Sequence, residues 1–122
     1  MHRMIVVLAL GLADCLSSKI EGSLVVDHQP VVPATCASHI EFYGIGIPLP
    51  NGARVRVLPQ PDGTVTGIYF APGAAVGTTL SAGCTHADLA ATGRTHGAPP
   101  MIQGTVSFDC EQVQGNLSVL CL

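Results

Sequence analysis

Glycine and proline recur too often along this chain for long helices to form. The 122 residues include 14 Gly and 9 Pro, and each destabilises a helix interior relative to Ala, Gly by about 1 kcal/mol and Pro by about 3 kcal/mol. From Cys36 onward, short apolar runs are separated by turn residues about every eight to twelve positions, which is typical of all-β folds. We therefore expect an all-β domain: a small antiparallel β-sandwich or open barrel of short strands and hairpins, stabilised by disulfides.

The first expected hairpin joins residues 54–57 (RVRV) to residues 64–70 (TVTGIYF). Residues 54–57 alternate with period two, so the valines face one side of the strand and the arginines the other. A two-residue turn at residues 62–63 (DG) would place Val55 opposite Phe70 on one face of the sheet. The neighbouring prolines cannot donate ladder hydrogen bonds, which indicates a looser tip than that turn provides.

The second expected hairpin lies at the C-terminal end of the sequence. Residues 105–110 alternate, as do residues 117–119, and residues 115–116 (GN) between them suit a type II′ turn. This turn would place Cys110 directly opposite Cys121.

Other elements are shorter. Residues 39–43 (HIEFY) are an expected strand, and residues 48–52 (PLPNG) and 71–73 (APG) are expected turns. Residues 85–91 are expected to form one or two helical turns, with Thr85 as the N-cap.

Residues 1–14 have the organisation of a secretory signal peptide. Arg3 precedes an uncharged apolar run over residues 4–13, and Asp14 follows. A helix of that length rises about 15 Å, half of what a bilayer core requires, so the run is too short to span a membrane. Its length and flanks match a signal h-region. The alternative is a buried N-terminal strand or helix of a cytosolic domain.

Two ways of processing this leader compete. Residues 11–13 (GLA) offer small residues at −3 and −1 for ordinary cleavage before Asp14. Residues 12–15 (LADC) are similar to a bacterial lipobox, although Asp14 departs from the pattern. Lipidation of Cys15 leaves an even number of cysteines, whereas ordinary cleavage leaves an odd thiol in an exported protein. We therefore expect Cys15 to carry the lipid.

Three segments are expected on this basis. Residues 1–14 are the signal peptide, residues 15–35 a lipid-anchored tether with a possible first strand at residues 23–26, and residues 36–122 the β-domain.

The four remaining cysteines are expected to form two disulfides, because so many cysteines in a short chain indicate an oxidising compartment. Three connectivities are open to Cys36, Cys84, Cys110 and Cys121. We favour Cys36–Cys84 with Cys110–Cys121, since each bridge then lies within one half of the chain.

Composition and motifs argue against several functions. The net charge is −3, with 5 Lys+Arg, so no basic face is expected for nucleic acid. The sequence contains neither a G-x-x-x-x-G-K phosphate loop nor a G-x-S-x-G nucleophile elbow. We expect no enzymatic activity, no catalytic residues and no cofactor.

One cluster has the residue types of a metal site. Cys84, His86 and His96, with Asp88 between them, would suit zinc or copper. The paired C-x-x-C spacing of structural zinc sites is absent, and a disulfide at Cys84 would remove its thiolate. Loop histidines on a surface are therefore the favoured interpretation, and a metal-binding module is the alternative function.

Several short pieces occur in a recognisable order, namely residues 12–15 (LADC), 36–38 (CAS), 52–57 (GARVRV), 61–63 (PDG), 71–73 (APG) and 83–84 (GC), followed by a terminal strand pair with two cysteines. This order resembles a group of short, uncharacterised envelope lipoproteins of myxobacteria and their relatives. The resemblance implies an envelope address and a β-domain, and it carries no activity.

Together these features predict a non-enzymatic bacterial cell-envelope lipoprotein. Its lipid anchor would hold it in the membrane, facing the periplasm or the exterior. The β-domain would be a binding or structural module, with an envelope protein or another envelope component as its partner.

Overall fold

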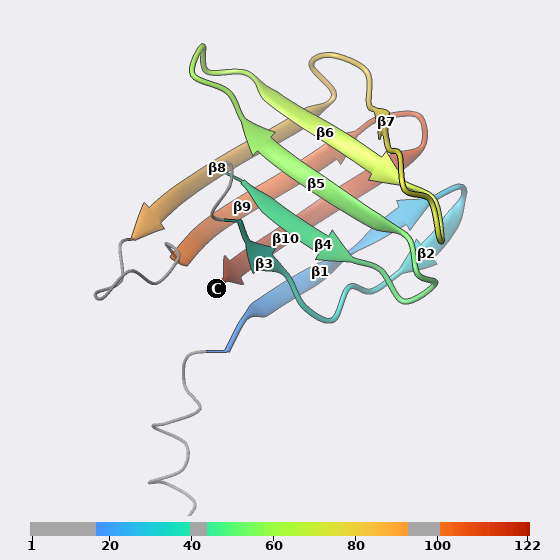
Figure 1. Ribbon diagram of the computed structural model, residues 1–122, viewed down its shortest axis with the longest axis horizontal. Coiled ribbons are helices and arrows are strands. Elements are labelled where there is room, and N and C mark those ends of the chain that lie inside the picture. The colour runs from blue at the N-terminus through green and yellow to red at the C-terminus, as the bar shows by residue number, and fades with distance from the viewer. Residues whose placement is uncertain (1–16, 40–43, 93–100) are drawn as a thin grey trace, which may run out of the picture.

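The computed structural model describes residues 17–39, 44–92 and 101–122, and these residues form two antiparallel β-sheets and no helix (Figure 1). Sheet A contains, in spatial order, β2 (Gln29–Val31), β1 (Lys19–Val26), β10 (Val113–Cys121), β9 (Met101–Asp109) and β8 (Thr85–Thr92). Sheet B contains β3 (Ala37–Ser38), β4 (Ile45–Pro48), β5 (Arg54–Pro59), β6 (Val65–Phe70) and β7 (Thr78–Thr79). The expected all-β, disulfide-stabilised fold is confirmed, in its sandwich form.

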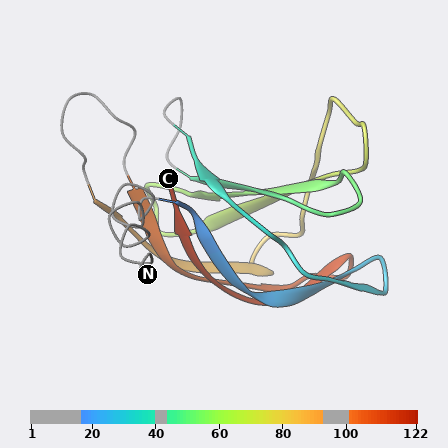
Figure 2. The ribbon, with the colours of Figure 1, turned by 90° about the horizontal axis from the view of Figure 1, so that it is seen from below.

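The two sheets form separate layers with the core between them, as the view in Figure 2 shows. The strands of sheet B cross those of sheet A at a wide angle (Figure 1). Aliphatic side chains from both sheets fill the gap; those buried most completely are Leu24, Ile45, Ile47, Ile102, Val55, Val57, Val106 and Val113. No helix in the described part of the chain is long and apolar enough to cross a membrane.

The β5–β6 hairpin forms as expected, but its register is shifted by one residue. The loop has three residues rather than two, because the Gln60 N–H donates to the Thr64 carbonyl (2.8 Å) and the Gly63 N–H donates to the Gln60 carbonyl (3.0 Å). Gly63 has φ +92°, so a type I turn is followed by a left-handed glycine. Val55 therefore lies opposite Tyr69. The predicted pairing of Val55 with Phe70 is wrong.

The shift moves Phe70 to the outer face of sheet B. A slip of one residue exchanges the two faces of a strand, so Phe70 lies opposite Arg54 on the side away from the core. The prediction that Val55 and Val57 face one side and the arginines the other is confirmed, since both valines are fully buried.

The C-terminal hairpin turns earlier than expected. The Cys110 N–H donates to the Val113 carbonyl (2.9 Å), so the turn lies at residues 111–112. The predicted turn at residues 115–116 is wrong, and both residues lie inside β10. Glycine there serves close packing, because a Cβ on Gly115 would overlap with the backbone of β1.

Two other expectations are corrected. Residues 85–91 belong to β8 rather than to helical turns, because β9 pairs with them along their whole length. The expected tether over residues 15–35 is too long, because β1 and β2 pair within sheet A and bury Leu24 and Val26 in the core. Residues 1–14 and most of the expected strand at residues 39–43 lie outside the described residues. The turns expected at residues 48–52 and 71–73 are confirmed.

The two disulfides differ from the pairing favoured on sequence grounds. Cys36, which precedes β3, is bonded to Cys121 at the end of β10, so this bridge links the two sheets. Cys84, which precedes β8, is bonded to Cys110, which follows β9. The favoured pairing of Cys110 with Cys121 is wrong because β10 separates them: its 9 residues span roughly 25 Å.

The strand glycines lead to a stability prediction. Gly104 in β9 has φ +148°, and a Cβ built there would overlap with the carbonyl oxygen of Asp88 on β8. We expect Gly104→Ala to lower the free energy of unfolding by more than about 3 kcal/mol, because β8 must move away from β9. Urea denaturation with intact disulfides measures this change.

Gly73→Ala is the matched control. Gly73 also has a positive φ (+77°), but nothing lies within 4 Å of a Cβ built there, so only the left-handed backbone is penalised, by about 1–2 kcal/mol. Equal losses in the two variants would contradict the close approach of β8 and β9.

Candidate functional site

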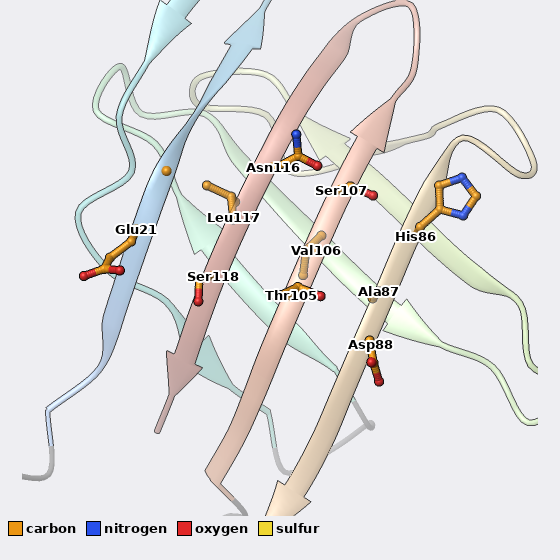
Figure 3. Close-up of a pocket in the computed structure, with 11 residues that line it drawn as sticks. Glu21, His86, Ala87, Asp88, Thr105, Val106, Ser107, Asn116, Leu117 and Ser118 are labelled. Atoms are coloured by element: carbon orange, nitrogen blue, oxygen red, sulfur yellow. The ribbon is translucent and has the colours of Figure 1, made fainter.

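The outer face of sheet A carries an open hollow of about 600 Å³, in which polar side chains surround a largely apolar floor (Figure 3). Its polar side chains come from four adjacent strands, and they are Glu21, His86, Asp88, Thr105, Ser107, Asn116 and Ser118. We call this surface the polar hollow. The central strands β9 and β10 contribute short side chains, whereas the flanking strands β1 and β8 contribute the longer Glu21 and His86. The face is therefore low in the middle.

Strand register arranges these side chains in two rows across the sheet. In the first row, Glu21 lies opposite Ser118, which lies opposite Thr105, which lies opposite Asp88. Neighbouring strands are about 4.8 Å apart, so the backbones that carry Glu21 and Asp88 at the two ends of this row are about 14 Å apart. The Glu21 side chain points away from Asp88 (Figure 3), so the two carboxylates do not converge on one point as a glycosidase pair does.

The second row brings a histidine beside a serine. Asn116 lies opposite Ser107, and Ser107 lies opposite His86, with Asp88 two residues further along β8. These residue types occur in nucleophilic catalysis, where the base must reach the nucleophile by a hydrogen bond. Within the described part of the chain, no side-chain hydrogen bond joins His86 to Ser107 or Asp88. Ser107 and His86 are therefore neighbouring hydrogen-bonding groups on the open face of sheet A.

The structure does not favour the alternative metal site. The Cys84 sulfur is bonded to Cys110 and is no thiolate ligand. His86 is on the outer face of β8, and His96 lies outside the described residues. Among residues 17–39, 44–92 and 101–122, no group of three or more potential metal ligands comes together. Cys15, the expected lipidation site, also lies outside the described residues.

A second cluster of polar side chains links sheet A to sheet B. Asp27 lies in the tight β1–β2 turn, where both Asp27 and His28 have positive φ (51° and 66°). Its carboxylate accepts hydrogen bonds from the Gln112 side chain (3.0 Å) and from the Tyr69 hydroxyl (3.4 Å). Tyr69 comes from sheet B and is only 5% exposed. Burial, and secondarily the Asp27 charge and hydrogen bond, raise the pKa of Tyr69 above its ordinary value.

Comparison with known proteins gives no relative from which a role could be transferred. No protein-family model matches the sequence, no curated protein is detectably similar to it, and no solved structure matches it. The resemblance to myxobacterial envelope lipoproteins stays a prediction.

Sequence reasoning found part of the polar hollow. The alternation expected over residues 105–110 and 117–119 agrees with the position of Ser107 and Ser118 on the outer face of sheet A. It does not assemble the two rows, because the turn predicted at residues 115–116 shifts the β9–β10 register and the helical turns predicted over residues 85–91 occupy part of β8. Residue types alone gave no signal, since serine, threonine and asparagine are common on any solvated strand.

The Tyr69–Asp27 contact leads to a pH prediction. In a Tyr43→Phe background, Tyr69 is the one tyrosine left, and we expect its phenolate to form with a midpoint above 10.0, the ordinary value. The folded protein then binds the phenolic proton more tightly than the unfolded chain does. The stability from this group is fully present below about pH 10 and is lost as the pH rises through the folded-state pKa.

Spectrophotometric titration of tyrosinate absorbance measures that midpoint. Adding Asp27→Asn should lower it without restoring 10.0, because desolvation is the larger cause of the raised pKa. A midpoint at 10.0 in the Tyr43→Phe protein would contradict the buried contact.

Proposed function

We propose that this chain is a bacterial cell-envelope lipoprotein, anchored through Cys15, whose β-sandwich is a non-enzymatic binding module. The observation that carries the binding role is the polar hollow, which presents hydrogen-bonding side chains from four strands. Two disulfides within a small domain support export, because disulfides persist in oxidising compartments such as the periplasm.

The start of β1 supports an anchor that holds the domain close to the membrane. β1 begins at Lys19, so three residues lie between it and Cys15. Four residue steps of fully extended chain reach about 14 Å. The longer tether expected over residues 15–35 is replaced by this short connection. A lipidated Cys15 would thus place the Lys19 end of sheet A next to the headgroups.

The chemistry of the polar hollow favours a glycan over a protein as its ligand. Binding hot spots for proteins are enriched in Trp, Tyr and Arg, and none of these is among the described residues that line the hollow. Its hydroxyl, amide and carboxylate groups instead match the donors and acceptors of a sugar polymer. Among envelope components, peptidoglycan offers such a polymer. Of the two kinds of partner expected from the sequence, an envelope protein or another envelope component, we propose the second, with peptidoglycan as the ligand.

The anchor is tested by Cys15→Ser. This substitution removes the acceptor for the lipid, so we expect the protein to leave the membrane fraction or to remain uncleaved. Two or more acyl chains suffice for stable attachment, at about 0.8 kcal/mol per buried CH₂. Membrane fractionation of the native protein measures anchoring, and its intact mass measures cleavage.

Ser17→Ala is the matched control, because Ser17 lies in the same short connection and is exposed. It should leave membrane attachment unchanged, and the intact mass should show the same cleavage and lipidation as in the wild type. If the Cys15→Ser protein is cleaved after Ala13 and fractionates like wild type, the lipoprotein proposal is wrong and ordinary secretion replaces it.

The binding role is tested by Thr105→Arg, which fills the centre of the polar hollow. We expect co-sedimentation with purified peptidoglycan to weaken at least about tenfold, because the long side chain blocks the hydroxyl and carboxylate groups around it. Gln103→Arg is the control: Gln103 is an exposed residue two positions away on β9 and does not line the hollow. Equal binding by the two variants, or no binding by wild type, would defeat the glycan proposal.

A further inference from the structure

The polar hollow runs across the strands of sheet A rather than along them (Figure 3). Its two polar rows lie two residues apart on each strand, and between them lies a third row that faces the core. The members of this middle row pair with one another across the sheet, and they are Gly22, Leu117, Val106 and Ala87. The Leu117 and Val106 side chains are buried in the core, so these residues offer the hollow mainly their backbone. The polar rows are therefore the two walls of the hollow, and the middle row is its floor.

Strand geometry sets the dimensions of the hollow. Two residues along a strand span about 7 Å, which separates the backbones that carry the two walls. Four strands about 4.8 Å apart span about 14 Å, which is the length of the hollow. β2 pairs with β1 only at residues 24–26, beyond the hollow, and β8 is the last strand of the sheet. Among the described strands, none closes either end, so the hollow suits one extended polymer chain that continues past both ends.

The walls are neutral in the middle and charged at the ends. The central strands β9 and β10 contribute three hydroxyls and one amide, from Thr105, Ser107, Ser118 and Asn116. Ser107 is half-buried and the other three are exposed, so a ligand can reach these groups. The carboxylates lie on the outermost strands, β1 and β8. An uncharged polymer with many hydroxyl and amide groups matches this distribution.

A β-1,4-linked sugar chain fits the walls and the floor together. Each pyranose unit of such a chain advances by about the spacing of neighbouring strands, about 4.8 Å, so successive units would lie over successive strands. A pyranose ring carries its polar groups at its edges and C–H groups on its faces. A chain lying flat in the hollow would therefore place C–H groups on the largely apolar floor and polar groups against the walls.

We propose that the polar hollow binds the interior of a β-1,4-linked glycan chain, with consecutive sugar units lying over β1, β10, β9 and β8. Because both ends of the hollow are open, the chain continues in both directions and its ends are not recognised. The inference rests on the glycan binding proposed above and names the part of the polymer that is bound. A peptide that extended the sheet would instead lie along an edge strand.

The test is NMR titration of the purified full chain with β-1,4-linked N-acetylglucosamine oligomers of increasing length, which share the backbone linkage of peptidoglycan glycan. We expect the affinity to rise about fivefold with each unit added, because each unit gains a net hydrogen bond on one further strand. The rise should stop at the tetramer, since four strands line the hollow. Reducing the terminal sugar of a hexamer to its alditol should leave the affinity unchanged, because the chain end is not bound.

Asp88→Ala removes a wall side chain at one end of the hollow. We expect it to weaken binding of the tetramer about fivefold and to leave the dimer unaffected, because a dimer can bind over the central strands. Asp109→Ala is the matched control: Asp109 is an exposed carboxylate on the neighbouring strand β9 and does not line the hollow. It should leave every affinity unchanged. Thermal melting verifies that both variants are folded at the titration temperature.

The outcomes separate this inference from the binding role itself. Affinity that does not depend on oligomer length, affinity that falls when the terminal sugar is reduced, or equal effects of Asp88→Ala and Asp109→Ala would overturn binding of a chain interior across the strands. If wild type sediments with peptidoglycan but binds none of the oligomers, this inference is wrong and the proposed glycan binding stands. If wild type binds neither, both are wrong.

Discussion

The Cys36–Cys121 disulfide is the constraint on which the rest of the sandwich depends. It joins the loop before β3 to the end of β10 in sheet A, across 85 positions of sequence. The same corner is closed by two hydrogen bonds: the Ser38 N–H donates to the Leu122 carbonyl (3.0 Å), and the Leu122 N–H donates to the Ser18 hydroxyl (3.0 Å). In the chain-entropy model, so long a closed loop stabilises the folded state by about 4.5 kcal/mol. The Cys84–Cys110 bridge closes a loop of 26 positions and adds about 3.5 kcal/mol. For a small core these are large contributions, comparable with the net stability of a whole domain.

Turn chemistry decides which side chains face outward. The loop containing Asp62 and Gly63 has one residue more than the shortest hairpin turn, and that residue moves Phe70 from the core to the outer face. The Thr64 hydroxyl (2.6 Å) and N–H (3.0 Å) both donate to the Asp62 carboxylate, which lowers the pKa of Asp62 and holds the loop in this form. The contacts of Arg54 and Arg56 with the Phe70 ring therefore follow from local hydrogen bonds in a loop several residues away.

Sequence patterns could predict the fold class and several turns, but not the register or the disulfides. Alternation in residues 54–57 correctly separated core valines from outward arginines, because period two is a local property of a strand. The error at β8 has a tertiary cause: the alanines and Leu89 in residues 85–91 favour a helix, but pairing with β9 overrides that preference. Register and cysteine partners depend on contacts distant in sequence, so the position of the C-terminal turn could not be read from the glycine and asparagine at residues 115–116. The polar hollow could not be predicted for the same reason, since it is assembled from four strands.

The pairing of the cysteines is the most direct test of this account. Trypsin cleaves after Arg56 and Arg94, and a glutamate-specific protease cleaves after Glu41 and Glu111, so combined digestion without reductant places the four cysteines on four peptides. The account predicts that the peptide containing Cys36 is linked to the C-terminal peptide containing Cys121. It also predicts that the peptide containing Cys84 is linked to the one containing Cys110. Mass spectrometry showing Cys36 linked to Cys84, or to Cys110, would contradict the sandwich described above.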